Sequence, residues 1–159
     1  MTRVIAFTHL PFAGFFFAAA TARAVLLSIL PLKALSLLGS AQHVSVLFFV
    51  VSVCGIGASL GIYSILRHIS LRTGFLISSL AMVFSIALLW TQDLWTFSLG
   101  MMFHVFGITS MEVILSLHVM QKIPRSQLSE FEPLRMVSTV LALSIGPWLG
   151  VYLQSRYAD

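Results

Sequence analysis

Residues 12–32 read FAGFFFAAATARAVLLSILPL, an apolar run in which Arg23 is the one charged residue. A helix needs about 20 mostly apolar residues to cross the hydrocarbon core of a bilayer, so this run has the length of a membrane span. Further runs along the chain have the same character. We therefore predict five transmembrane helices, at about residues 12–32, 44–66, 73–90, 95–120 and 136–153.

The composition of the whole chain agrees with a membrane protein. Of its 159 residues, 58% are hydrophobic and 9% are charged, whereas about a quarter of the residues are charged in a typical soluble domain. The runs are apolar on all faces and lack the alternation of barrel strands, which favours helices. The sequence predicts an all-α, polytopic transmembrane bundle that forms one domain over residues 1–159.

The basic residues indicate an orientation in the membrane. Lys and Arg number nine against five Asp and Glu, but they lie between the apolar runs and form no basic face, which argues against a nucleic-acid partner. The positive-inside rule places the N-terminus in the cytoplasm, because most basic residues then lie inside. The inside set is Arg3, Arg67, Arg72, Lys122, Arg125 and Arg135, and the outside set is Lys33 and Arg156.

The ends of the runs carry two further signals. Trp90 and Trp95 flank a short turn, where amphipathic rings anchor at the outer interface. The N-terminal stretch with the string TARA (21–24) imitates a signal peptide, but His9 and Pro11 interrupt its apolar core, and apolar residues continue to Leu32. A transmembrane helix accounts for more of this segment.

The sequence offers little for catalysis or metal binding. Cys54 is the single cysteine and lies in an apolar run, so we expect a buried, inert thiol and no disulfide. No H-E-x-x-H motif and no nucleophile with its base is visible. We expect no enzymatic activity, no catalytic residues, no metal and no cofactor.

Charged residues inside the spans are the first candidates for a functional site. A central arginine costs about 2.5 to 3.5 kcal/mol on insertion scales and usually finds a partner inside the bundle. The one carboxylate well inside a predicted span is Glu112, about 7 Å from Arg23 in depth at a rise of 1.5 Å per residue. We predict that Arg23 and Glu112 pair, either in a functional cavity or as a structural contact between helices.

Other polar and small residues are weaker candidates. His104 is either a cavity residue near Glu112 or a packed histidine, and the hydroxyls of the fourth span either line a passage or bond to their own backbone. In the second span, CGIGASLG (54–61) places small residues at spacings that allow close helix approach. We expect this segment to pack tightly inside the bundle; a substrate passage is the alternative.

The fifth span carries a more specific pattern. ALSIGPWLGVYL (142–153) resembles the G-x-x-x-G-P-x-x-G-G signature in the fifth helix of the major facilitator superfamily of transporters, with Gly146, Pro147 and Gly150 at matching positions. Ala142 and Val151 replace the first and last glycines. Pro147 should bend the helix.

Other segments resemble the same family in order and spacing. Residues 30–52 look like its first outer loop and second helix, and 106–128 like its fourth helix running into a cytoplasmic loop. The loop signature between the second and third helices should fall on GIYSILRHISLRTG (61–74). Arg67 and Arg72 match its basic positions, but its acidic residue is missing.

The resemblance implies a fold and a function. Family members have twelve helices in two halves, so the chain would be an incomplete N-terminal half in a bacterial inner membrane, moving a small-molecule substrate by alternating access. Its partners would be the lipid bilayer and either the missing helices on another chain or further copies in a homo-oligomer. Arg23 and Glu112 would then face a central cavity. The alternative is a non-transporting membrane subunit or an inactive fragment.

Overall fold

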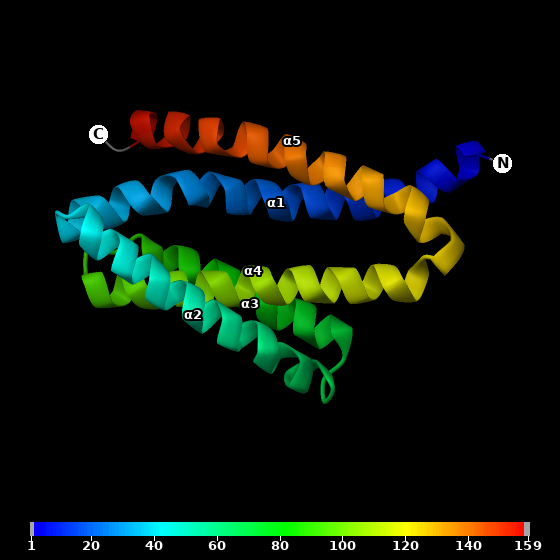
Figure 1. Cartoon of the computed structure of the whole chain (residues 1–159), viewed down its shortest axis with the longest axis horizontal. Coiled ribbons are helices and arrows are strands. Elements are labelled where there is room, and N and C mark those ends of the chain that lie inside the picture. The colour runs from blue at the N-terminus through cyan, green and yellow to red at the C-terminus, as the bar shows by residue number, and fades with distance from the viewer. Residues whose placement is uncertain (1, 158–159) are drawn as a thin grey trace. The chain divides into compact units, whose positions relative to one another are not determined.

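The computed structural model describes the backbone of residues 2–157 and the side chains of residues 11–156 apart from 63, 65, 66 and 125. This part of the chain folds into five helices joined by short turns (Figure 1). Each helix contains a segment long and apolar enough to cross a membrane, so the predicted all-α class is confirmed and all five predicted spans are candidate membrane spans. The helices are α1 (Thr2–Leu38), α2 (Ala41–Leu66), α3 (Leu71–Leu89), α4 (Leu94–Lys122) and α5 (Arg125–Tyr157).

The chain divides into two compact units. The first unit consists of residues 1–32 and 116–159, and it holds most of α1, the end of α4 and all of α5. The second unit consists of residues 33–115, and it holds the end of α1, α2, α3 and most of α4. Both α1 and α4 therefore contribute to both units.

The first helix is longer than its apolar run predicts. α1 continues through Pro31 and Lys33 to Leu38, so the outer loop expected after residue 32 is wrong. Gly39 ends the helix with φ of 65°, and its amide donates a hydrogen bond of 2.8 Å to the carbonyl of Leu35. A left-handed residue directly after a helix favours glycine, because glycine lacks a Cβ.

The predicted cytoplasmic loop before the fifth span is also mostly helical. α4 ends at Lys122 and α5 begins at Arg125, so Ile123 and Pro124 form the whole connection. The low hydropathy of the polar residues that follow predicts a loop. They extend α5 instead, because Gln, Leu, Glu and Arg are good helix formers whatever their polarity.

The two remaining turns have ordinary helix caps. Ser70 caps α3, and its hydroxyl accepts a hydrogen bond of 3.2 Å from the amide of Thr73. Asp93 caps α4, where one carboxylate oxygen accepts bonds from the amide and the hydroxyl of Thr96 at 2.9 and 2.8 Å. These bonds lower the pKa of Asp93 below its ordinary value. Trp90 and Trp95 are exposed on either side of this turn.

Candidate functional site in the spanning helices

The glycines of the fifth-helix pattern pack against α1 within the first unit. A Cβ added to Gly146 would lie 3.1 Å from the carbonyl carbon of Ala24, and one added to Gly150 would lie 2.6 Å from the carbonyl oxygen of Val25. An added Cβ at Gly146 would lie still closer to the Cβ of Ala24. Real Cβ atoms essentially never show contacts under 3.0 Å, so both positions require glycine at this helix separation. The two helices run in the same direction, side by side (Figure 1).

This contact follows a stripe of small residues on both helices. Ala142, Gly146 and Gly150 recur every four residues on α5, and Ala24 and Ser28 do so on α1. Ala24 and Ala142 are completely buried. Small residues let helix backbones approach closely in a membrane, where dispersion contacts replace the hydrophobic effect as the packing force.

Pro147 lies within the same segment without breaking α5. The helix continues on both sides of it, from Arg125 to Tyr157. Proline removes one backbone donor, and neighbouring packing commonly compensates for that loss in membrane helices. One turn beyond Gly150, the side-chain oxygen of Gln154 is buried and accepts no hydrogen bond among the described residues.

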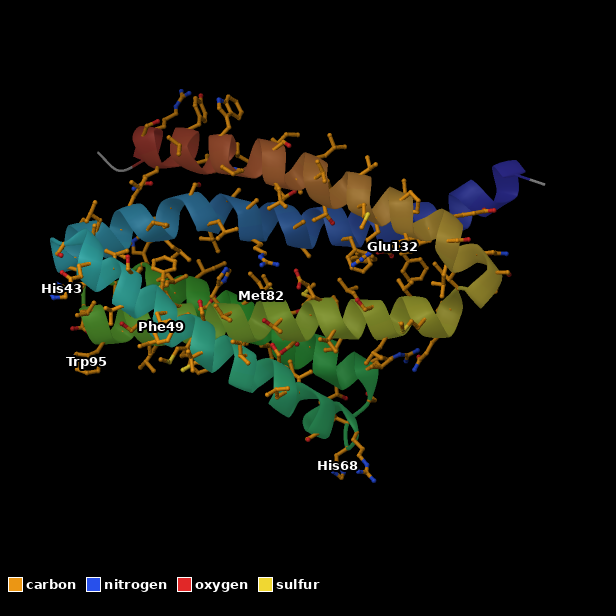
Figure 2. The ribbon with its side chains drawn as sticks, viewed as in Figure 1. His43, Phe49, His68, Met82, Trp95 and Glu132 are labelled. Carbon is orange, nitrogen blue, oxygen red and sulfur yellow. The ribbon has the colours of Figure 1, made fainter. Side chains whose placement is uncertain are left out.

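A second cluster joins α1 to the start of α5 and was not anticipated from the sequence. The rings of Phe16 and Phe131 lie 6.3 Å apart, and the guanidinium of Arg135 lies 5.4 Å from the Phe16 ring. Arg135 also donates to the carboxylate of Glu132, which is labelled in Figure 2. The E-x-x-R spacing of Glu132 and Arg135 is the signal that could have revealed the pair.

Arg23 lies one residue before Ala24, on a different face of α1. Phe16 and Leu30 lie seven residues before and after it, so the three side chains share a face of the helix. Phe16 and Leu30 are buried and Arg23 is exposed. Leu27, one turn after Arg23, is also exposed, so the buried positions of this face lie two turns from Arg23 on either side.

Glu112 lies on α4 within the apolar span Leu94–Lys122. Its side chain is exposed, and Leu115, three residues further on, is buried. Because Arg23 belongs to the first unit and Glu112 to the second, their pairing stays a prediction.

His104 is buried where α3 and α4 pack together in the second unit. It is 5% exposed, and its Nδ1 lies 3.5 Å from the hydroxyl of Ser85, which is fully buried. Gly100 and Gly107 lie on the same face of α4 as His104 and approach the backbone of α3. A Cβ on Gly107 would lie 3.1 Å from the carbonyl oxygen of Ser78. His104 is thus the titratable member of a closely packed helix contact.

Two hydroxyls in the middle of α4 bond to their own helix. Thr109 donates to the carbonyl of Val105 at 2.8 Å, and Ser110 donates to that of Phe106 at 2.6 Å. At these two positions the geometry matches bonding to the backbone, one of the two interpretations of these hydroxyls.

Lys33 makes a long-range contact that sequence reasoning missed. Its ammonium donates a hydrogen bond of 2.6 Å to the carbonyl of Leu89, the last residue of α3, and lies 6.0 Å from the centre of the Phe97 ring. A cation is favourable at a helix C-terminus, where carbonyl groups lack partners. No local pattern announces this contact, because 56 residues separate Lys33 from Leu89.

Two expectations for α2 were wrong. Cys54 is exposed and not buried. Gly55 packs against Val105 as expected, but Gly57 and Gly61 have no described atom within 4 Å of an added Cβ, so they do not pack closely within the second unit. Hydropathy cannot separate a lipid-facing position from a protein-facing one, because both are apolar in a membrane helix.

The remaining predicted residues lie on the surface. Arg67 and Arg72 are exposed at the turn between α2 and α3. Among the described residues, no group of three His, Cys, Asp or Glu side chains is arranged to hold a metal ion. Comparison of the chain with protein-family models, with curated proteins and with solved structures finds no match.

Proposed function

We propose that this chain is the membrane-embedded part of a permease that moves a small solute by alternating access, in the manner of the major facilitator superfamily. The observation that carries the proposal is the presence of Arg23 and Glu112 inside apolar spans. Charges at this depth are costly, and they mark substrate or ion pathways in membrane proteins. A bacterial inner membrane with a cytoplasmic N-terminus is part of the same proposal.

The packing of α1 on α5 supports the proposal. Alternating access rocks groups of helices as rigid bodies around a central site. Gly146 and Gly150 allow α1 and α5 to approach closely over about one helical turn, which suits a pair of helices that moves as one. In this interpretation the glycine pattern of α5 holds the pair together, and Arg23 stands on the neighbouring face of α1.

A second candidate function is that of a non-transporting membrane subunit. The open positions Gly57 and Gly61 on α2 favour it, because two glycines four residues apart let another helix approach. The two functions differ in what surrounds Arg23 and Glu112. A permease needs water there in at least one state, and a subunit assembled by packing alone does not.

Thiol accessibility tests this difference. On a Cys54→Ser background, Ala19→Cys and Ser116→Cys place single thiols one helical turn from Arg23 and from Glu112. Phe49→Cys is the control, because Phe49 is 69% exposed on α2 and its thiol would lie in lipid (Figure 2). The purified chain in sealed liposomes is treated with a membrane-impermeant thiol reagent, which reacts only with hydrated thiolates.

The proposal predicts labelling at positions 19 and 116 and none at 49. A solute from a broad panel that slows labelling at 19 and 116 then identifies the substrate class, and uptake of that solute into liposomes completes the test. Unreactive thiols at both positions would leave the subunit function as the better description.

A further inference from the structure

The end of α5 presents three exposed side chains in a row, spaced four residues apart. Trp148 and Tyr152 are 66% and 44% exposed, and their rings stack with centroids 5.7 Å apart and an interplanar angle of 13°. Arg156 follows, also exposed, and its guanidinium donates a hydrogen bond of 2.8 Å to the Tyr152 hydroxyl. The spacing places all three on one face of the helix.

The hydrogen bond fixes the direction of the arginine. The Arg156 side chain bends back along α5 toward Tyr152 instead of extending beyond the end of the helix. A guanidinium has five N–H donors, and the bond to Tyr152 uses one of them. The other donors remain available to an acceptor above the two rings.

No described carboxylate on α5 lies near enough to take these donors. Glu132 is the nearest along the helix, 24 residues before Arg156, which corresponds to about 36 Å at 1.5 Å per residue. Glu132 is moreover engaged by Arg135. The positive charge of Arg156 therefore calls for an anion from outside the described part of α5.

The position of Trp148, Tyr152 and Arg156 along α5 indicates which anion lies near Arg156. The apolar span of α5 is Ser126–Arg156, so the row lies where the span ends. Tryptophan and tyrosine are enriched at this level of a membrane, beside the lipid headgroups. Phosphate is the anion of that layer, and arginine binds phosphate through paired, charge-assisted hydrogen bonds.

We propose that Trp148, Tyr152 and Arg156 form a binding site for the headgroup phosphate of a phospholipid. Arg156 donates to the phosphate oxygens, Tyr152 orients the guanidinium, and the two rings pack along the upper part of the acyl chains. The site is independent of the transport function proposed above and holds α5 at a fixed depth.

Native mass spectrometry of the purified, partly delipidated chain tests the site. Phosphatidylglycerol and a diacylglycerol with the same acyl chains are titrated separately, so that the phosphate group is the main difference. We expect phosphatidylglycerol to bind the chain and diacylglycerol to bind at least about tenfold more weakly, since one to two charge-assisted bonds separate them. Arg156→Gln should remove this preference, and Tyr152→Phe should reduce it by a smaller factor.

Matched variants separate the site from general charge effects. Arg67→Gln removes an exposed arginine at the turn between α2 and α3 and should leave phosphatidylglycerol binding unchanged. Arg156→Lys keeps the charge but loses the paired geometry, so its affinity should fall between those of Arg156 and Arg156→Gln. Asp159→Asn, three residues beyond Arg156, should bind phosphatidylglycerol at least as well as the parent chain.

Three results would overturn the proposal. The first is equal binding of the two lipids, and the second is an equal loss on Arg67→Gln and Arg156→Gln. The third is a chain that forms dimers through Arg156 in the absence of phospholipid, which would assign the arginine to a carboxylate of a second copy of the chain.

Discussion

Two pairs of glycines with the same spacing have opposite environments in this protein. Gly146 and Gly150 on α5 lie against the backbone of α1, where an added Cβ has no room. Gly57 and Gly61 on α2 have open space around them among the described residues. Both pairs interrupt apolar segments of similar composition, and the sequence around the α2 pair is if anything richer in small residues.

The difference shows that spacing permits close packing without establishing it. The α5 pair meets a complementary stripe, because Ala24 and Ser28 on α1 are themselves small and four residues apart. Gly55, two residues before Gly57, does meet another helix through Val105. One face of α2 is thus packed and the adjacent face is open. The number of glycines in the segment does not distinguish the two faces.

The largest effect should come from filling the two glycine pairs. Gly146→Ala with Gly150→Ala should lower the free energy of unfolding by about 2 to 4 kcal/mol, because two methyl groups must push the helix backbones apart. Gly57→Ala with Gly61→Ala should raise it by up to about 1 kcal/mol, because alanine is the better helix former. Circular dichroism during titration with sodium dodecyl sulfate measures both. A similar loss of unfolding free energy in the two double variants would contradict the difference in packing between the two glycine pairs.

Exchanging the charges of Arg23 and Glu112 tests whether these two side chains pair, next to the close contact of α1 with α5. Arg23→Glu or Glu112→Arg alone should each destabilise the fold by about 2 to 3 kcal/mol if the charges pair within the membrane. The double variant should recover most of that loss. Single variants that each unfold like the parent chain would exclude the predicted pair. The titration used for the glycine variants is the measurement.

Gln154 tests how far the packed stripe extends along α5. Its buried oxygen has no described partner, so Gln154→Met should raise the free energy of unfolding by about 1 kcal/mol, by removing an unpaired polar atom. Gln42→Met, at an exposed position of α2, is the matched control and should leave stability unchanged. A loss of stability in Gln154→Met would show that the amide is needed at this contact.

The smallest expected effect is on the pH dependence of stability and concerns two helix N-caps, the charged Asp93 and the uncharged Ser70. The pKa of Asp93 is lowered by its bonds to Thr96, so the stabilisation is fully present above the ordinary carboxyl value of 3.8 and disappears as the pH falls below it through the lowered value. The melting temperature should fall slightly less below pH 3.8 in Asp93→Ser than in the parent chain, because serine has no carboxylate to protonate. Ser70→Ala at the uncharged cap should lower the melting temperature equally at pH 3 and pH 7.

The sequence was sufficient for the class of fold and the number of spans, because apolar runs of about 20 residues have few other uses. It was insufficient for the ends of the helices. Residues 33–38 and 125–135 are helical although they carry polar side chains, and these side chains made the apolar runs look shorter than the helices.

The candidate site was predictable in part. The charges at Arg23 and Glu112 are conspicuous in apolar runs, and the resemblance to a fifth-helix transporter signature drew attention to Gly146 and Gly150. The contacts of His104 with Ser85 and of Arg135 with Phe16 join residues from different helices. No local pattern contains such pairs, because they depend on which helix faces are brought together.

The contact of Lys33 with Leu89 has a consequence for synthesis of the chain. The carbonyl that receives the ammonium is made 56 residues after Lys33 itself, which takes about 3 to 11 seconds at 5 to 20 residues per second. Until then the Lys33 ammonium cannot make this hydrogen bond. Completion of α3 then supplies the partner, so the Lys33 segment of the first helix gains this contact only after Leu89 has been made.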